Sequence, residues 1–230
     1  MSIRFSQLRK TNLTEARNER VDVVITFGRF NPPTSGHQLL VESVQKIAKQ
    51  LGAEHIIYAT QSNDKNKNPL KFKDKVLFMK KAFLGANIST DKNVRTLFEA
   101  LEGLVKAGKK RIVMVVGGDR VNEFDKLVRK YVDDMGIEFF KVMSAGKRDP
   151  DADDITGMSA SKLRQAAAEG KYDIFKSGMA SGLKDPDIRK LYKKVRDGMG
   201  IKESKINESF EIFGGDKIDG YLLFSNPHEF

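Results

Sequence analysis

The feature that most constrains the fold is a change of residue pattern between positions 21 and 51. A mainly apolar run from Val21 to Phe27, broken by Asp22, is typical of a buried strand. A loop with Gly28 and two adjacent prolines follows. From Ser35 on, apolar residues recur at helical spacing, namely Leu40, Val44, Ile47 and Leu51. We therefore expect a strand over residues 22–27, a tight loop, and a helix over residues 35–51.

The start of this helix has the properties of an anion site. The first backbone N–H groups of a helix lack intrahelical partners and, together with the helix dipole, favour negative charge. Gly28 permits close approach of the backbone, Thr34 or Ser35 can cap the helix, and His37 falls in the first turn. The residue types alone leave two interpretations open, which are a phosphate site and a strand–loop–helix unit without a ligand.

The remaining chain alternates between strand and helix patterns. Strands are expected over residues 55–60, 112–116 and 137–142, and helices over about 94–107, 120–133, 158–169, 172–177 and 185–198. Pro69 is expected to open a further helix, whose buried side would contain Val76, Phe78, Met79, Phe83 and Leu84. This order predicts an α/β fold with a Rossmann-like open parallel sheet, helices on both faces, and a mainly helical C-terminal third.

Ligands of such sheets bind beyond the carboxyl ends of the strands. This rule brings together three loops, at residues 28–37, 61–69 and 117–120. A length of 230 residues suits one domain with a substantial core. We expect an N-terminal arm over residues 1–20, the main domain over 21–200, and a C-terminal tail over 201–230.

Composition narrows the classes of protein that fit. Forty per cent apolar and nine per cent aromatic residues are values typical of a folded domain. The absence of cysteine excludes disulfides, zinc–thiolate sites and thiol nucleophiles, and suits a reducing compartment. No apolar run approaches the roughly 18 residues that a membrane span needs, and the charged N-terminus is unlike a secretory signal. We therefore expect a cytoplasmic protein without membrane contact.

The formal net charge of +10 raises the question of nucleic-acid binding. The lysines are scattered between acidic residues, and basic runs such as Lys109-Lys110-Arg111 are short. A solvated basic surface that attracts polyanionic nucleotides is favoured over a dedicated nucleic-acid face. The sequence leaves the oligomeric state open.

The ten residues Gly28 to His37, which read GRFNPPTSGH, resemble a signature of the nucleotidylyltransferase superfamily that is commonly written H/T-x-G-H. The glycine, the phenylalanine, the proline and the final Gly-His all stand at the spacing of the family. Thr34 replaces the first histidine, a variant that occurs in the phosphopantetheine branch.

A second resemblance lies roughly 120 residues further along the chain. Thr156 to Arg164, which reads TGMSASKLR, is similar to the I-S-x-T/S-x-x-R element of the same family, with Met158 in the place of the apolar residue. Ser159 and Ser161 would offer donors at a helix N-terminus, and Arg164 would offer a fork of donors for phosphate oxygens. Taken alone, the segment also fits a serine-capped surface helix, but the two elements together favour function.

The resemblance implies nucleotidyl transfer, in which a phosphate-bearing acceptor attacks the α-phosphorus of a nucleoside triphosphate and pyrophosphate leaves. It implies catalytic roles for three residues: Thr34 positions the attacking phosphate, His37 donates to the triphosphate, and Arg164 holds the β- or γ-phosphate. Nucleotide contacts are implied at Gly28, Arg29, Phe30, Gly36, Lys67, Gly117, Asp119, Ser159 and Ser161. Which lysine of residues 65–71 contacts phosphate stays open. Mg²⁺ would bridge the triphosphate oxygens, and no protein metal ligand is assigned.

The motifs are closest to members that join ATP to nicotinamide mononucleotide, and we favour this small-molecule pair. CTP remains an alternative, because cytidylyltransferases carry a related Arg-Thr-x-Gly-Ile-Ser element that residues 156–159 share in part, although Ile155 replaces its arginine. Thr34 keeps phosphopantetheine open as the acceptor.

Two rival interpretations belong to other classes. Residues 158–162 are faintly similar to the Lys-Met-Ser-Lys-Ser loop of class I aminoacyl-tRNA synthetases, but the chain is too short to add an anticodon domain. The second rival is a non-catalytic phage virion or nucleic-acid-binding protein on the same fold. Leu13-Thr14-Glu15 and Ile206-Asn207-Glu208 are similar to sites at which tailed phages trim capsid proteins, and would place the protein in the host cytoplasm or the virion interior. The retained Gly36, His37 and Arg164 argue against a binding-only protein.

Overall fold

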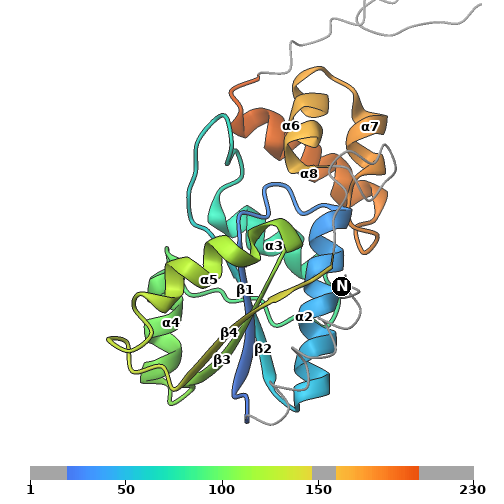
Figure 1. Cartoon of the computed structure of the whole chain (residues 1–230). Helices are drawn as coiled ribbons and strands as arrows, with labels where there is room; N and C mark the ends of the chain where they lie inside the picture. The colour runs from blue at the N-terminus through green and yellow to red at the C-terminus, as the bar shows by residue number, and fades with distance from the viewer. Residues whose placement is uncertain (1–19, 147–158, 202–230) are drawn as a thin grey trace, which may run out of the picture.

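The structure is a computed structural model that describes residues 20–146 and 159–201. Its centre is a parallel sheet of four strands in the order β2-β1-β3-β4 (Figure 1). The strands are β1 (Val23–Gly28), β2 (Glu54–Ala59), β3 (Arg111–Val116) and β4 (Phe139–Ser144). They confirm the four predicted strands, and their bounds differ from the predicted ones by one or two residues.

The pairing of β1 with its two neighbours is unequal. β1 pairs with β2 along its whole length, from Val23 to Gly28. Its pairing with β3 ends at Ile25 and Met114, so the two strands separate toward their carboxyl ends. The chain continues from β1 to β2 on one side of β1, and later returns to β3 on its other side. The point between β1 and β3 is therefore the topological switch point, where α/β sheets bind ligands.

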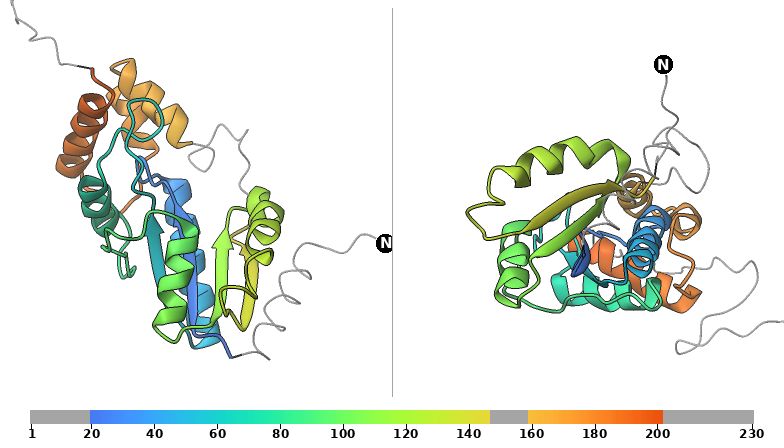
Figure 2. Two further views of the ribbon diagram at one scale, coloured as in Figure 1. Left: turned by 90° about the vertical axis from the view of Figure 1, so that its left-hand side faces the viewer. Right: turned by 60° about the horizontal axis from the view of Figure 1, so that its bottom comes forward.

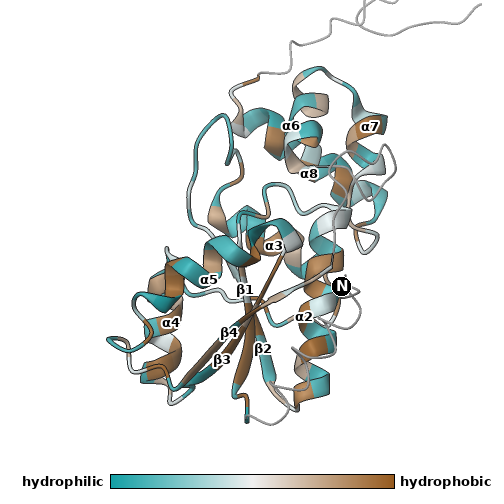
Figure 3. Cartoon of the chain, in the orientation of Figure 1, coloured by the Kyte–Doolittle hydropathy of each residue, from teal (hydrophilic) through white to brown (hydrophobic). Residues whose placement is uncertain are grey.

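Helices cover both faces of the sheet (Figure 2). On one face, α2 (Ser35–Leu51) and α3 (Phe72–Ala82) pack with Val24 and Val113 in a single apolar cluster. On the other face, α4 (Leu97–Lys106) and α5 (Val121–Arg129) pack against Ile25 and Met114. In Figure 3, β3 is hydrophobic along its length after the first residue, Arg111, whereas α2 is hydrophobic on one side. These layers confirm the predicted Rossmann-like α/β fold.

The last three helices lie beyond the carboxyl ends of the strands (Figure 1). They are α6 (Ala160–Ala168), α7 (Tyr172–Ser177) and α8 (Asp185–Gly198), and they agree closely with the predicted helical third. Their apolar residues Leu163, Phe175 and Leu191 join the cluster that contains α2 and α3. Ion pairs between Lys81 and Asp187 and between Lys194 and Asp74 connect α8 to α3.

Local capping explains where several helices begin. Thr34 is the N-cap of α2, as predicted, and Ser159 is the N-cap of α6. Thr96 caps α4 in a capping box with Glu99, whose carboxylate accepts from the Thr96 N–H at 2.7 Å. The helix predicted from residue 94 therefore begins at Leu97.

Three details of the prediction are wrong. α3 begins at Phe72 and not at Pro69, because the Asn31 side chain accepts from the Leu70 N–H at 3.1 Å and donates to the Leu70 carbonyl at 3.4 Å. These bonds keep the chain before Phe72 out of the helix. Leu84 is 77% exposed because α3 ends before it, although the other four residues predicted on that side are buried. The helix predicted over residues 120–133 starts as the 3-10 turn η1 (Gly118–Arg120), and α5 ends at Arg129.

Several expectations fall outside the described residues. These are the N-terminal arm, the first part of the second signature at residues 156–158, both trimming-site triplets and the final tail. The three proposed domain ranges remain predictions. Within residues 20–146 and 159–201, no helix has both the length and the apolar character that crossing a bilayer requires.

The core position of Leu101 leads to a stability prediction. Leu101 is fully buried on α4, so Leu101→Ala should lower the free energy of unfolding by about 2–5 kcal/mol. Leu84→Ala is the matched control, and its exposed side chain should give a change within about 0.5 kcal/mol. Urea unfolding measures both values, and equal losses in the two variants would contradict the assignment of the core.

Candidate active site

The loop between β1 and α2 is shaped by a buried phenylalanine. Phe30 is fully buried and has a positive φ of 47°, a backbone conformation that residues with a side chain rarely adopt. Its ring lies 4.9 Å from the His37 ring and 5.9 Å from the Phe83 ring, centroid to centroid. A Cβ atom on Gly28 would stand 3.1 Å from the Phe30 ring, so a glycine suits that position. The Phe30 ring therefore packs against the His37 ring. Because the Phe30 side chain is fully buried, Phe30 could contact a ligand only through its backbone.

Thr34 and His37 hold each other in a capping box at the start of α2. The Thr34 hydroxyl accepts from the His37 N–H at 3.3 Å, and the Thr34 N–H donates to His37 Nδ1 at 3.1 Å. Because Nδ1 is an acceptor, the neutral ring carries its proton on Nε2. His37 thus has a defined donor, Nε2–H. The Thr34 side chain is fully buried and belongs to the cap, so its contact with an acceptor phosphate stays a prediction.

The first turn of α2 keeps one amide for a ligand. Ser35 N–H donates to the Gly178 carbonyl at 3.0 Å, and His37 N–H donates to Thr34. Within residues 20–146 and 159–201, the N–H of Gly36 has no protein acceptor. A free amide beside the positive end of a 17-residue helix is a suitable place for a phosphate oxygen.

Arg164 joins three segments that are distant in sequence. Its side chain is buried, with 8% exposed. Nη1 donates to the Asn31 carbonyl at 2.7 Å, Nε donates to the Asn66 carbonyl at 3.1 Å, and Nη2 donates to the Ser161 hydroxyl at 3.0 Å. Asn31 belongs to the first signature and Asn66 to the loop after β2. The two signatures, 133 residues apart at this contact, therefore meet at one place.

The loop after β2 is organised by a carboxylate. Asp64 accepts from the backbone N–H groups of Lys67 at 2.6 Å and Asn66 at 2.9 Å, and from the Asn68 amide at 2.6 Å. These bonds, above all the one from Lys67, hold the pKa of Asp64 at about 2. The side chains of Lys65 and Lys67 are both exposed on this loop, so the structure does not distinguish between them as phosphate ligands.

A lysine lies buried behind the same edge of the sheet. Lys75 on α3 is fully buried, and its Nζ donates to the Thr60 carbonyl at 2.6 Å. Burial, and to a smaller extent the positive charge of Arg29, lowers the pKa of Lys75 to about 8. Burial and Arg29 also lower the pKa of Arg164. The nearby Asp64 opposes both shifts.

The loop after β3 is close-packed around two glycines. A Cβ atom on Gly117 would stand 2.8 Å from an oxygen of Asp119, and one on Gly118 would stand 3.0 Å from the Gly146 carbonyl. The Asp119 side chain is exposed at the carboxyl end of β3. In the described part of the chain, no cluster of three or more His, Asp or Glu side chains could hold a metal ion. A Mg²⁺ ion at this edge would take phosphate oxygens and water as ligands, a donor set that it prefers.

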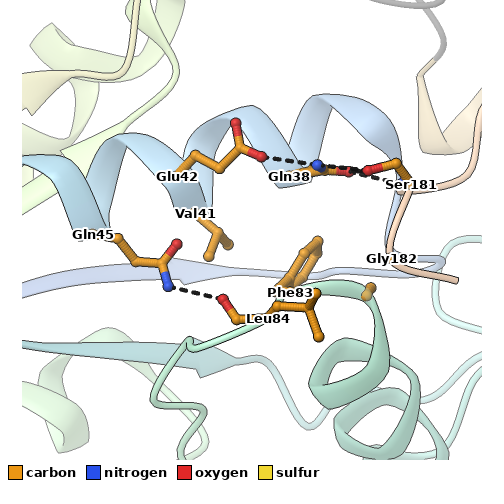
Figure 4. Close-up of a pocket in the computed structure, with 9 residues that line it drawn as sticks. Gln38, Val41, Glu42, Gln45, Phe83, Leu84, Ser181 and Gly182 are labelled. Carbon is orange, nitrogen blue, oxygen red and sulfur yellow. Dashed lines mark hydrogen bonds between the residues drawn. The ribbon is translucent and has the colours of Figure 1, made fainter.

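Two further observations define the limits of the site, namely the cap formed by Ser159 and a cavity beside α2. Ser159 uses its hydroxyl to cap α6, where it accepts from the Lys162 N–H at 3.1 Å. A cavity of about 240 Å³ lies beside α2, between Gln38, Glu42, Phe83 and Ser181 (Figure 4). None of the predicted site residues lines it. The candidate site is therefore the edge where the loops meet, and not this cavity.

A model of the cytidylyltransferase-like family matches residues 25–166, which is more than half of the chain. The chain belongs to this family. Both signatures lie within the match, and the family is part of the nucleotidylyltransferase superfamily that the motifs resemble. Family membership supports a nucleotidyltransferase, whereas phage origin has no support from it.

Two solved structures are similar to the chain at low identity. One is a bifunctional NMN adenylyltransferase/ADP-ribose pyrophosphatase from Francisella tularensis, in complex with AMP and a manganese ion, at 16% identity and a TM-score of 0.49. The other is TmcAL from Thermotoga maritima bound to α-thio ATP, at 11% identity and a TM-score of 0.45. Each match covers 78% of this chain, which spans 52% and 57% of those chains. No curated protein sequence matches the chain.

Three residues of the site were not predicted from the sequence. Asn31 lies inside the first signature, but its bonds to Leu70 and Arg164 depend on distant segments. Asp64 stands in a polar loop, where its capping role has no distinct pattern. Lys75 had a usable signal, because it stands four residues before Met79 on the apolar side of α3, where a lysine is out of place.

The bonds of Arg164 predict a loss of stability when the side chain is removed. Arg164→Ala leaves the buried Asn31 carbonyl and the Asn66 carbonyl without their charged donor, and should lower the free energy of unfolding by about 1.5–3 kcal/mol. Arg129→Ala is the control, because Arg129 is exposed and, within the described part of the chain, is bonded only to Asp125 on its own helix, a pair worth about 0.3–0.5 kcal/mol. Equal urea-unfolding curves for the two variants would contradict the bridging role.

Proposed function

We propose that the chain transfers a nucleotidyl group from a nucleoside triphosphate, with ATP favoured, to a phosphate-bearing acceptor such as nicotinamide mononucleotide, and releases pyrophosphate. The observation that carries the proposal is the 2.7 Å hydrogen bond from Arg164 to Asn31, which joins the two signatures. Membership of the cytidylyltransferase-like family supports the reaction class. The preference for ATP and a mononucleotide depends on the resemblance of the motifs.

The reaction suits a site without a general base. An oxygen of the acceptor phosphate is already ionised, and it forms a bond to the α-phosphorus while the bond from that phosphorus to the bridging β-oxygen breaks. The chain has to align the two groups and stabilise the developing charge. His37 Nε2–H and the Gly36 N–H donate to triphosphate oxygens, and Arg29 and Arg164 add positive charge. A bound Mg²⁺ would supply further neutralisation of the phosphate oxygens.

Cytidylyl transfer is the second candidate, because the matching family model is the cytidylyltransferase-like one. Release of pyrophosphate with Mg²⁺ distinguishes the candidates when ATP and CTP are each tested with nicotinamide mononucleotide, phosphopantetheine, flavin mononucleotide and glycerol phosphate. Release with a single pair identifies both substrates. Salt-sensitive DNA binding without pyrophosphate release would favour the non-catalytic alternative.

The donor role of His37 predicts a large loss of rate. His37→Ala should lower kcat/KM for the active pair by about 100-fold or more, because one donor to the developing charge is lost. His55→Ala is the control, since His55 lies at the start of β2, at the opposite end of the sheet, where its ring accepts from the Asn87 N–H. A rate within a few-fold of wild type for folded His37→Ala would refute the assignment.

A further inference from the structure

Lys75 is a buried cation without a buried anion to match it. Its side chain is fully buried, and Nζ donates to the Thr60 carbonyl at 2.6 Å and to the Thr60 hydroxyl at 3.3 Å. Both acceptors are neutral. Among the described residues, no carboxylate forms an ion pair with it. Two of the three ammonium N–H groups therefore have neutral acceptors. The positive charge is not neutralised, which is unfavourable in a protein interior.

The position of Lys75 links it to the first signature. Thr60 follows the last residue of β2, and its N–H donates to the Gly28 carbonyl at 2.8 Å. One chain of bonds thus runs from Lys75 through Thr60 to Gly28, where the first signature begins. Through these bonds, Lys75 connects α3 to the carboxyl ends of β1 and β2, next to the candidate site.

The charges around Lys75 are mostly positive. Arg29 approaches from the loop after β1, and its charge lowers the pKa of both Lys75 and Arg164. Asp64 on the loop after β2 acts in the opposite direction on both groups. Its carboxylate is already engaged by Asn66, Lys67 and Asn68. An anion that binds beside Arg29 would supply the negative charge that this cluster lacks.

We propose that Lys75 is a positioning residue of the nucleotide site, which holds Thr60 at the end of β2 and becomes fully protonated when the phosphates of a nucleoside triphosphate bind beside Arg29. This inference rests on the proposed function, because it requires a triphosphate at that edge. The inference assigns a role in the site to a residue outside both signatures, and it predicts that a proton is taken up when the triphosphate binds.

The amount of proton uptake follows from the titration of Lys75. With a pKa of about 8 in the free protein, the amino group is half protonated at pH 8. Negative charge raises this pKa, so binding should take up about half a proton at pH 8, close to one at pH 9, and almost none at pH 6.5. By the same linkage, the affinity for the triphosphate should fall as the pH rises through 8.

Calorimetry of binding tests the proposal. ATP with Mg²⁺ is titrated into the full chain at pH 6.5, 8 and 9, in two buffers that differ in ionisation enthalpy, and the difference in heat gives the protons taken up. Lys75→Met removes the charge, and Lys75→Arg keeps a charge that does not titrate in this range. Lys73→Met is the matched control, because Lys73 lies exposed on the same helix.

The expected result is proton uptake that rises from pH 6.5 to pH 9 in wild type and in Lys73→Met, and that is lost in both Lys75 variants. Equal uptake in wild type and in the Lys75 variants would overturn the role of Lys75 and leave the proposed function intact. Failure of the folded wild type to bind ATP would overturn both.

A second measurement on the wild type avoids any dependence on the folding of the variants. The Cε chemical shift of Lys75 in ¹³C-lysine-labelled protein should titrate with a midpoint near 8 without ATP and at about 10 or above with saturating ATP. A midpoint that ATP leaves unchanged would overturn the proposal.

Discussion

The candidate site depends on the hydrogen bonds of one buried guanidinium group. The three segments that Arg164 joins belong to separate units of the fold, namely the loop after β1, the loop after β2, and α6. A planar side chain with donors in fixed directions can hold such segments in one arrangement, which a flexible ammonium group does less well. Asn31 extends the network, because its side chain holds Leu70 while its carbonyl accepts from Arg164. The loops are therefore positioned before any ligand arrives.

This arrangement gathers positive charge at the carboxyl edge of the sheet. Arg29 lowers the pKa of Lys75, and Asp64, the carboxylate that acts in the opposite direction, is bonded to its own loop. Lys75 and Arg164 are buried cations whose hydrogen-bond partners are neutral. Because burial without an opposite charge is unfavourable, their presence at one edge favours an interpretation in terms of an anionic ligand. The unequal pairing of β1, which leaves β3 after Ile25, opens the sheet at the same place.

Local signals explain what the sequence predicted well. α2 and α8 begin and end close to the predicted residues because a threonine cap and an Asp-Pro start act within a few positions of the helix. The wrong start at Pro69 has a distant cause, which is the bond between Asn31 and Leu70, 39 residues apart. Motif resemblance predicted a functional role for Arg164, but only the folded chain shows that its guanidinium donates to two backbone carbonyls and to the Ser161 hydroxyl. The roles of all predicted site residues toward a ligand, those of His37 and Arg164 included, stay predictions.

The central claim is that loops far apart in sequence form one nucleotide site at the carboxyl edge of the sheet. Hydrogen–deuterium exchange with and without ATP and Mg²⁺ tests it most directly, because each loop reports separately. The account predicts slower exchange in residues 28–37, 61–70 and 159–164 together, with no change at residues 52–54 and 108–110 at the opposite end of the sheet. Protection confined to one loop, or protection at the opposite end alone, would contradict it.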